Sequence, residues 1–121
     1  KVLSLKTPSS VSWIQYWTLL DSKKYHHALF FGHLALEKAF KAKVTQHTQD
    51  LPPKIHDLIK LAQKANIDLS DQQIIELREI NSFNLRARYQ EYKFKYYKKA
   101  TQEYTDSWLQ KINTYIIWLK K

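Results

Sequence analysis

The sequence contains no cysteine and has very little glycine and proline. Without cysteine there is no disulfide, no thiolate nucleophile and no cysteine-ligated metal site. A single glycine cannot form the glycine-rich loops that cradle phosphates in many nucleotide-binding folds. All-β sandwiches and barrels need turn residues about every 8–12 positions, and one glycine with three prolines cannot supply them. These absences favour long helices with few interruptions.

Long hydrophobic runs are also missing. No apolar segment approaches the roughly 20 residues that a membrane-spanning helix needs. The start of the chain, Lys1–Lys6, is too short to be the apolar region of a secretion signal. We therefore expect no membrane association and a cytoplasmic location. A chain of 121 residues can bury a core of its own as one domain.

Acidic residues are outnumbered, with 11 Asp and Glu against 20 Lys and Arg, for a formal net charge of +9. Such an excess indicates acidic partners such as nucleic acid or nucleotides, although it also serves solubility alone. Only three of the basic residues are arginines, Arg78, Arg86 and Arg88. Because the guanidinium group suits bidentate recognition of phosphate better than an ammonium does, these three are the more informative.

What is present is a repeated spacing of apolar residues by three and four, the period of an amphipathic helix. We expect residues 1–8 to be a tail and residues 9–121 to form a single domain. The predicted helices cover about 11–23, 24–47, 55–65, 70–83 and 98–120. The fold class is therefore predicted to be all-α, an antiparallel up-and-down bundle of about five helices.

Three local features refine this prediction. Pro53 lies where a third helix could begin, and Ser70 with Gln73 resembles a capping box for the fourth. Gly32 falls inside the apolar stripe of the second helix, where it would let another backbone approach closely. Residues 84–95 have weak periodicity, and we predict an irregular, functional stretch there.

Candidate catalytic residues are few. His33 and Glu37 share one face of the second helix, which we expect to be solvated, but two ligands do not make a metal site, and Glu37 also suits a pair with Lys41. His56 and Asp57 open the third helix, where a carboxylate caps free amides, and catalysis there would need a partner from elsewhere in the fold. We predict no metal and no cofactor, and keep Glu37, His56 and Asp57 as secondary candidates for ligand binding.

Residues 84–99 alternate basic and aromatic side chains. This pattern is typical of surfaces that combine phosphate contacts with base stacking. An alternative is that tyrosine rings pack inward beneath lysine stems. The candidate residues for binding an anion, a nucleotide or RNA are Arg86, Arg88, Tyr89, Lys93 and Lys95.

Three ordered motifs resemble HEPN domains and together cover nearly the whole chain. The first, residues 25–42, resembles the second helix of the family, with an aromatic residue and Ala before a Glu-Lys-Ala-x-Lys-Ala pattern. The second is Pro52-Pro53 followed by His56-Asp57-Leu58, similar to the Pro-x-x-His-Asp-Leu entry to the third helix. The last is Asn84-x-x-Ala87-Arg88-Tyr89 with Tyr97-Lys-x-Ala100-Thr101, similar to one bacterial subgroup.

The resemblance implies a helical bundle that dimerises through its helices and often has a minimal nucleotidyltransferase as its partner. In several such pairs the HEPN protein is an RNA-cutting toxin and the nucleotidyltransferase is its antidote. The ribonuclease branch uses an Arg followed a few residues later by His. Here all five histidines precede all three arginines, so that pair is absent. The tyrosine that receives a nucleotide in the family follows the missing His, and Tyr89 is its analogue by neighbourhood only.

We therefore expect a homodimeric HEPN protein that partners a nucleotidyltransferase in a toxin–antitoxin-like pair and binds nucleotide or RNA. Its dimer face is expected to be aromatic and to include Trp13, Trp17 and Phe30. One alternative is an RNA-cleaving toxin with a non-standard active site, in which His56 meets Arg86 or Arg88. Another is a non-catalytic module that binds RNA or a nucleotide, so whether the chain is an enzyme stays open.

Overall fold

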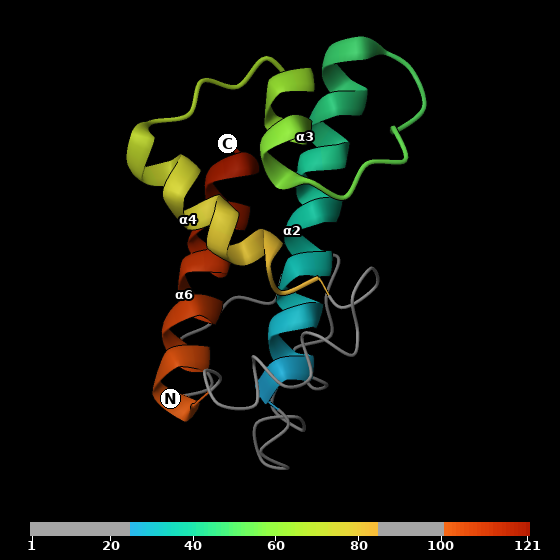
Figure 1. Ribbon diagram of the computed structural model, residues 1–121. Coiled ribbons are helices and arrows are strands. Elements are labelled where there is room, and N and C mark those ends of the chain that lie inside the picture. Colours follow the sequence, from blue (N-terminus) through green and yellow to red (C-terminus); the bar gives the residue numbers. More distant parts are fainter. Residues whose placement is uncertain (1–24, 85–100) are drawn as a thin grey trace.

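The computed structural model describes residues 25–84 and 101–121, and within these ranges the chain is helical with no strand (Figure 1). The predicted all-α class is confirmed. The predicted helix over 11–23 and the segment 85–100 lie outside the described residues. The described helices are α2 (Tyr25–Thr48), α3 (Leu58–Lys64), α4 (Asp71–Asn81) and α6 (Gln102–Leu119).

The two longest of these helices, α2 and α6, lie side by side and run in the same direction (Figure 1). They are not neighbours in the sequence, so an up-and-down path can bring them together in parallel. They pack tightly at Gly32, where a Cβ atom would lie 2.8 Å from both Leu109 Cδ2 and Ile112 Cδ1. The predicted close approach at Gly32 therefore exists, but side chains of α6, rather than a backbone, make it.

All four described helices contribute to one core. Phe40 of α2 is completely buried, as are Leu58 and Leu61 of α3 and Leu77 and Ile80 of α4. Removing this much apolar surface from water is the dominant stabilising contribution in a domain of this size. From α6 the core receives Leu109, Ile112, Tyr115, Ile116 and Leu119.

The helix ends follow local capping chemistry. At α4 the amide of Gln73 donates to Ser70 Oγ over 3.1 Å, and the Ser70 amide donates to Gln73 Oε1 over 2.9 Å, which confirms the predicted capping box. The third helix, however, begins at Leu58 and not near Pro53. Asp57 is its cap, because its carboxylate accepts from the amides of Ile59 and Lys60.

At its other end α3 stops in a Schellman motif. Asn66 has a φ of 58°, a left-handed conformation that asparagine tolerates better than most residues. The Ile67 amide then donates to the carbonyl of Ala62 over 2.9 Å, and the Asn66 amide donates to that of Gln63 over 3.0 Å. This turn directs Ile67 back toward the core, against which it packs.

Two tyrosine–glutamate pairs connect α4 to α6. Tyr115 Oη donates to Glu76 Oε1 over 2.7 Å, and Tyr104 donates to Glu79. Burial and then the hydrogen bond to Glu76 raise the pKa of Tyr115. The same hydrogen bond is the main cause that lowers the pKa of Glu76. The phenol is therefore a fixed donor and the carboxylate a fixed acceptor at neutral pH.

Among the described helices, none combines the length and the apolar character needed to cross a membrane.

Candidate functional site

Glu37 is a carboxylate residue that is only 4% exposed in the middle of α2. Its Oε2 atom lies 2.9 Å from Lys41 Nζ, one turn along the helix, and 2.9 Å from Nδ1 of His56. Its Oε1 atom lies 3.7 Å from Nδ1 of His33. The predicted pair with Lys41 is confirmed.

The expectation that this face of α2 is solvated is wrong. The side chain of His33 is fully buried and that of Glu37 is 6% exposed, and His56 from the segment before α3 contacts Glu37. A carboxylate taken out of water is costly unless it is paired and hydrogen-bonded. Basic groups surround Glu37 on its own helix and from a second segment, which meets that condition.

The start of α3 is fastened to the end of α4 by Asn81. Its side-chain amide donates to Asp57 Oδ1 over 2.9 Å, and its carbonyl oxygen accepts from the Leu58 amide over 2.9 Å. Asp57 thus caps α3, as its position predicted, and also holds Asn81. Since both polar ends of Asn81 are engaged, the two segments are fixed relative to each other.

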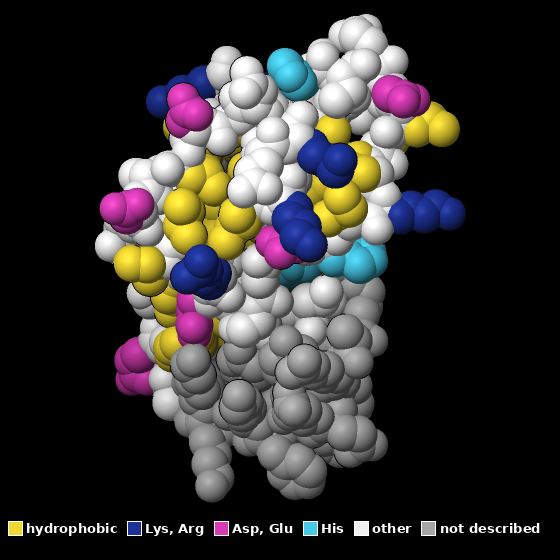
Figure 2. Space-filling model, turned by 45° about the horizontal axis from the view of Figure 1, so that its top comes forward, with side chains coloured by type: hydrophobic (Ala, Val, Ile, Leu, Met, Phe, Trp, Pro, Cys, Tyr) yellow, Lys and Arg dark blue, Asp and Glu magenta, His cyan; other side chains and the backbone are white. Residues whose placement is uncertain are grey.

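Beside these contacts is a small hollow of about 200 Å³ lined by His56, Asp57, Asn81 and Asn84. The side chain of His56 is 48% exposed. Because its Nδ1 atom faces Glu37, Nε2 is the nitrogen through which His56 can meet a ligand. On the face drawn in Figure 2, acidic, basic and histidine side chains lie together.

This arrangement is suited to hydrogen bonding and to proton transfer. A carboxylate that fixes one imidazole nitrogen orients the other for hydrogen bonding or proton transfer. Amide groups from Asn81 and Asn84 add uncharged donors and acceptors to the same hollow. Within the part of the chain that the structure describes, no three His, Asp or Glu side chains are grouped so as to hold a metal ion.

The structure thus brings together the three secondary candidates, Glu37, His56 and Asp57. Phe30, predicted at the dimer face, is half-buried on α2 with its ring centroid 6.2 Å from that of Phe31, and its role in a dimer stays a prediction. The other predicted residues lie outside the described ranges: Arg86, Arg88, Tyr89, Lys93 and Lys95 of the basic segment, and Trp13 and Trp17 of the dimer face.

Two residues of the hollow, Asn81 and Asn84, were not predicted from the sequence. Asn84 entered the sequence argument only as the first residue of a motif, and Asn81 is one polar residue in the last turn of a helix. Asparagine near a helix end usually has a local capping explanation. The contact from Asn81 to Asp57 spans 24 residues, and no local pattern indicates it.

Comparison with known proteins gives one result. The family description "HEPN domain" matches residues 17–121, which is well over half of the chain. No curated protein and no solved structure gave a significant match. The matched range contains every described helix and the whole Glu37–His56–Asn81 arrangement. The chain therefore belongs to the HEPN domain family.

Proposed function

We propose that this HEPN protein binds the phosphate-bearing part of a nucleotide or RNA at the hollow beside His56, as a homodimeric partner of a nucleotidyltransferase in a toxin–antitoxin-like pair. The observation that carries the binding proposal is the Glu37–His56 contact of 2.9 Å. It adds a hydrogen-bonding partner to a buried carboxylate that Lys41 also pairs, and it presents a half-exposed imidazole at the hollow.

The carboxylates of this site are already engaged by other groups. Glu37 is paired with Lys41 and His56, and Asp57 accepts from backbone amides and Asn81. Those donors to Asp57 are neutral and leave its charge in place, so the positive charge for a phosphate depends on the arginines of the basic segment. Asparagine amides and an imidazole are common hydrogen-bonding partners of phosphate oxygens.

The arginines of the basic segment follow this hollow closely along the chain. Arg86 comes two residues after Asn84, and Arg88 four residues after it. An arginine side chain is long and can bind phosphate in bidentate fashion. Chain connectivity thus supports a shared site for His56, Asn84 and an arginine.

Partnership with a nucleotidyltransferase and homodimerisation are proposed from family membership and from the predicted aromatic face. Sedimentation or light scattering of the purified chain at micromolar concentration tests the dimer. Co-expression with a nucleotidyltransferase encoded beside this gene tests the partnership, and we expect the two chains to co-purify. A monomer that binds no such partner would contradict this part of the proposal.

The binding proposal is tested with a fluorescently labelled single-stranded RNA. We expect Arg86→Ala and Arg88→Ala to weaken binding about 5- to 100-fold, the range of one or two lost charge-assisted contacts, and to reduce the dependence of affinity on salt. Arg78→Ala is the matched control. Arg78 is exposed on α4, and its replacement removes the same charge. Equal losses of RNA affinity in all three variants would mean that the effect comes from net charge alone.

RNA cleavage is the second candidate function, and one specific observation favours it. Glu37 orients the imidazole of His56 in the way that a carboxylate orients a general base. We expect His56→Gln to abolish any cleavage of RNA by the purified protein, and to weaken RNA binding only several-fold because the glutamine amide can still donate a hydrogen bond to phosphate. The His56→Gln protein purified in parallel also controls for contaminating nuclease, and equal cleavage by both preparations would exclude this role.

A further inference from the structure

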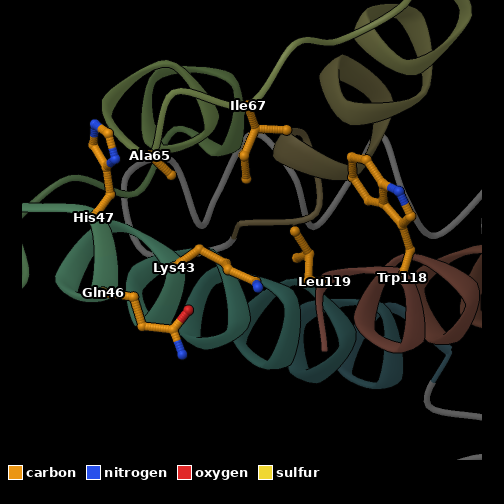
Figure 3. Close-up of a pocket in the computed structure, with 7 residues that line it drawn as sticks. All are labelled: Lys43, Gln46, His47, Ala65, Ile67, Trp118 and Leu119. Carbon is orange, nitrogen blue, oxygen red and sulfur yellow. The ribbon is translucent and has the colours of Figure 1, made fainter. Parts of the chain in front are cut away.

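A second and larger hollow lies at the opposite end of α3 from His56. It has a volume of about 400 Å³ and is formed where the last turns of α2, α3 and α6 come together. Figure 3 shows its lining residues, which are Lys43, Gln46, His47, Ala65, Ile67, Trp118 and Leu119. Neither the predicted binding segment nor the site around His56 includes any of them.

The floor of this hollow is apolar, and its residues are held in place by burial and by the turn that ends α3. Leu119 is 4% exposed and Ala65 is 9% exposed, and the Schellman motif at the end of α3 fixes Ile67. Apolar floors with few polar groups at the edge are typical of sites for small organic ligands, and sites of this kind commonly have volumes of about 300–1,000 Å³.

The edge of the hollow combines an indole with basic groups. Trp118 is 37% exposed, and its ring meets the ring of Tyr115 edge-on at 6.0 Å and 73°, which gives it a defined orientation. Figure 3 shows the Lys43 side chain extending along α2 with its ammonium group toward the middle of the hollow, between His47 and Trp118.

The charged side chains that line the hollow are basic. A neighbouring hollow of about 390 Å³ shares Lys43, Gln46 and Leu119 with it and adds Lys38 and Lys120. No acidic side chain lines either hollow among the described residues. An occupant should therefore carry negative charge as well as an apolar or aromatic part.

We infer that this Trp118–Lys43 hollow binds a nucleobase together with its phosphate. The base stacks on the indole of Trp118 over the floor of Ile67 and Leu119, and the phosphate pairs with Lys43. Aromatic stacking plus a nearby cation is the combination with which proteins bind single nucleotides and unpaired bases. An acidic peptide would need several side-chain pockets in a row along a groove, whereas Trp118 is the large aromatic residue among those that line these two adjoining hollows.

The inference deepens the proposed function and rests on it, because it gives the same class of ligand a second point of contact. The two sites are separate. Lys43 is six residues beyond Glu37 on α2, about 9 Å along the helix and about 120° around it. Two separated contacts would let the protein bind a strand at two places, or bind a free nucleotide at this hollow alone.

The experiment uses the full chain with AMP, adenosine, ribose 5-phosphate and a short 5′-phosphorylated oligoadenylate as probes. Binding is followed by calorimetry and by amide shifts in NMR spectra. We expect AMP to bind more tightly than adenosine or ribose 5-phosphate, each of which lacks one half of the recognised group. Trp118→Leu should weaken binding about 5- to 100-fold, the range for a lost stacking contact, and Lys43→Gln should weaken AMP binding but not adenosine binding.

Matched controls separate these effects from folding and net charge. Ile117→Ala removes an exposed apolar side chain next to Trp118, and Lys60→Gln removes an exposed ammonium group from α3. Both should leave AMP binding unchanged. Thermal unfolding followed by circular dichroism should show that Trp118→Leu and Lys43→Gln are folded.

The probes also distinguish the source of the nucleotide. Equal affinity for AMP and the oligoadenylate supports a free nucleotide, and binding of the oligoadenylate alone supports a strand. No binding of either probe, or binding that Trp118→Leu and Lys43→Gln leave unchanged, would overturn the inference, as would binding of an acidic peptide only. Loss of RNA binding in Arg86→Ala with AMP binding retained would confirm this hollow separately from the site beside His56.

Discussion

Nδ1 of His56 lies 2.9 Å from Oε2 of Glu37, although 19 residues separate them in the sequence. The contact joins the middle of α2 to the residue just before the cap of α3. It therefore has two consequences at once: it pairs a buried carboxylate, and it fixes which edge of the imidazole faces the hollow. Under the proposed function, this contact would serve both stability and ligand binding.

Removing the charge of Glu37 tests how much these contacts contribute to stability. We expect Glu37→Gln to lower the free energy of unfolding by about 1–3 kcal/mol, because a buried, charge-assisted set of contacts is lost. Chemical denaturation at pH 7 measures this change. Asp68→Asn, which removes the same charge from an exposed connection, is the control and should change stability by less than about 0.5 kcal/mol. Similar values for both variants would mean that the pairing of Glu37 contributes little.

The cap of α3 allows a cleaner comparison within one position. Asp57→Ala removes the acceptor for the amides of Ile59 and Lys60 and for the side chain of Asn81. We expect a loss of about 1–2 kcal/mol in the free energy of unfolding. Asp57→Asn keeps an oxygen at the capping position and should retain most of the stability. If Asp57→Asn were as damaging as Asp57→Ala, the carboxylate charge rather than the capping geometry would be decisive.

The helices could be predicted because their causes are local. Apolar spacing placed α2 within a residue of its observed end, and the Ser70–Gln73 box placed the start of α4 correctly. The start of α3 was misplaced because Pro53 suits a first turn. The cap formed by Asp57 determined the start of the helix more strongly than Pro53 did, since a cap satisfies several free amides at once.

The site could be predicted only in part, for a physical reason. Residue type marked Glu37, His56 and Asp57 as candidates, but their meeting depends on how the loop before α3 crosses α2. The burial of His33 and Glu37 was missed because charged and titratable residues are usually exposed. The exception arises when partners arrive from another segment, as His56 does here. The contacts of Asn81 depend on the same long-range packing.

Gly32 gives a prediction in which two effects oppose each other. Gly32→Ala gains about 1 kcal/mol of helix propensity, but its Cβ would lie 2.8 Å from the ends of the Leu109 and Ile112 side chains. Because those ends can shift slightly, we expect a net change within about 1 kcal/mol.

Gly32→Val should separate the two effects. Its branched side chain adds two methyl groups at the same place, and we expect a loss of about 2 kcal/mol or more from overpacking. Chemical denaturation of both variants measures the difference. A stable Gly32→Val protein would mean that α2 and α6 can move apart without loss of packing.

The Tyr115–Glu76 hydrogen bond predicts how stability depends on pH. The bond lowers the pKa of Glu76 in the folded chain below its ordinary value of 4.5. The stabilisation is therefore fully present above that value and is lost as the pH falls through the lower, folded-state pKa. We expect Tyr115→Phe to be less stable than the parent chain at pH 7 by about 1–2 kcal/mol, the range of a hydrogen bond to a charged group.

The difference between Tyr115→Phe and the parent should shrink as the pH is lowered from about 5 toward 2, because protonated Glu76 is a weaker acceptor. Urea denaturation at several pH values measures it. Thr114→Ala is the control: Thr114 is an exposed neighbour on α6 whose hydroxyl donates to the carbonyl of Gln110 in the same helix, and its removal should show no such dependence. A Tyr115→Phe difference that stays constant with pH would assign the effect to packing of the ring and not to its bond with Glu76.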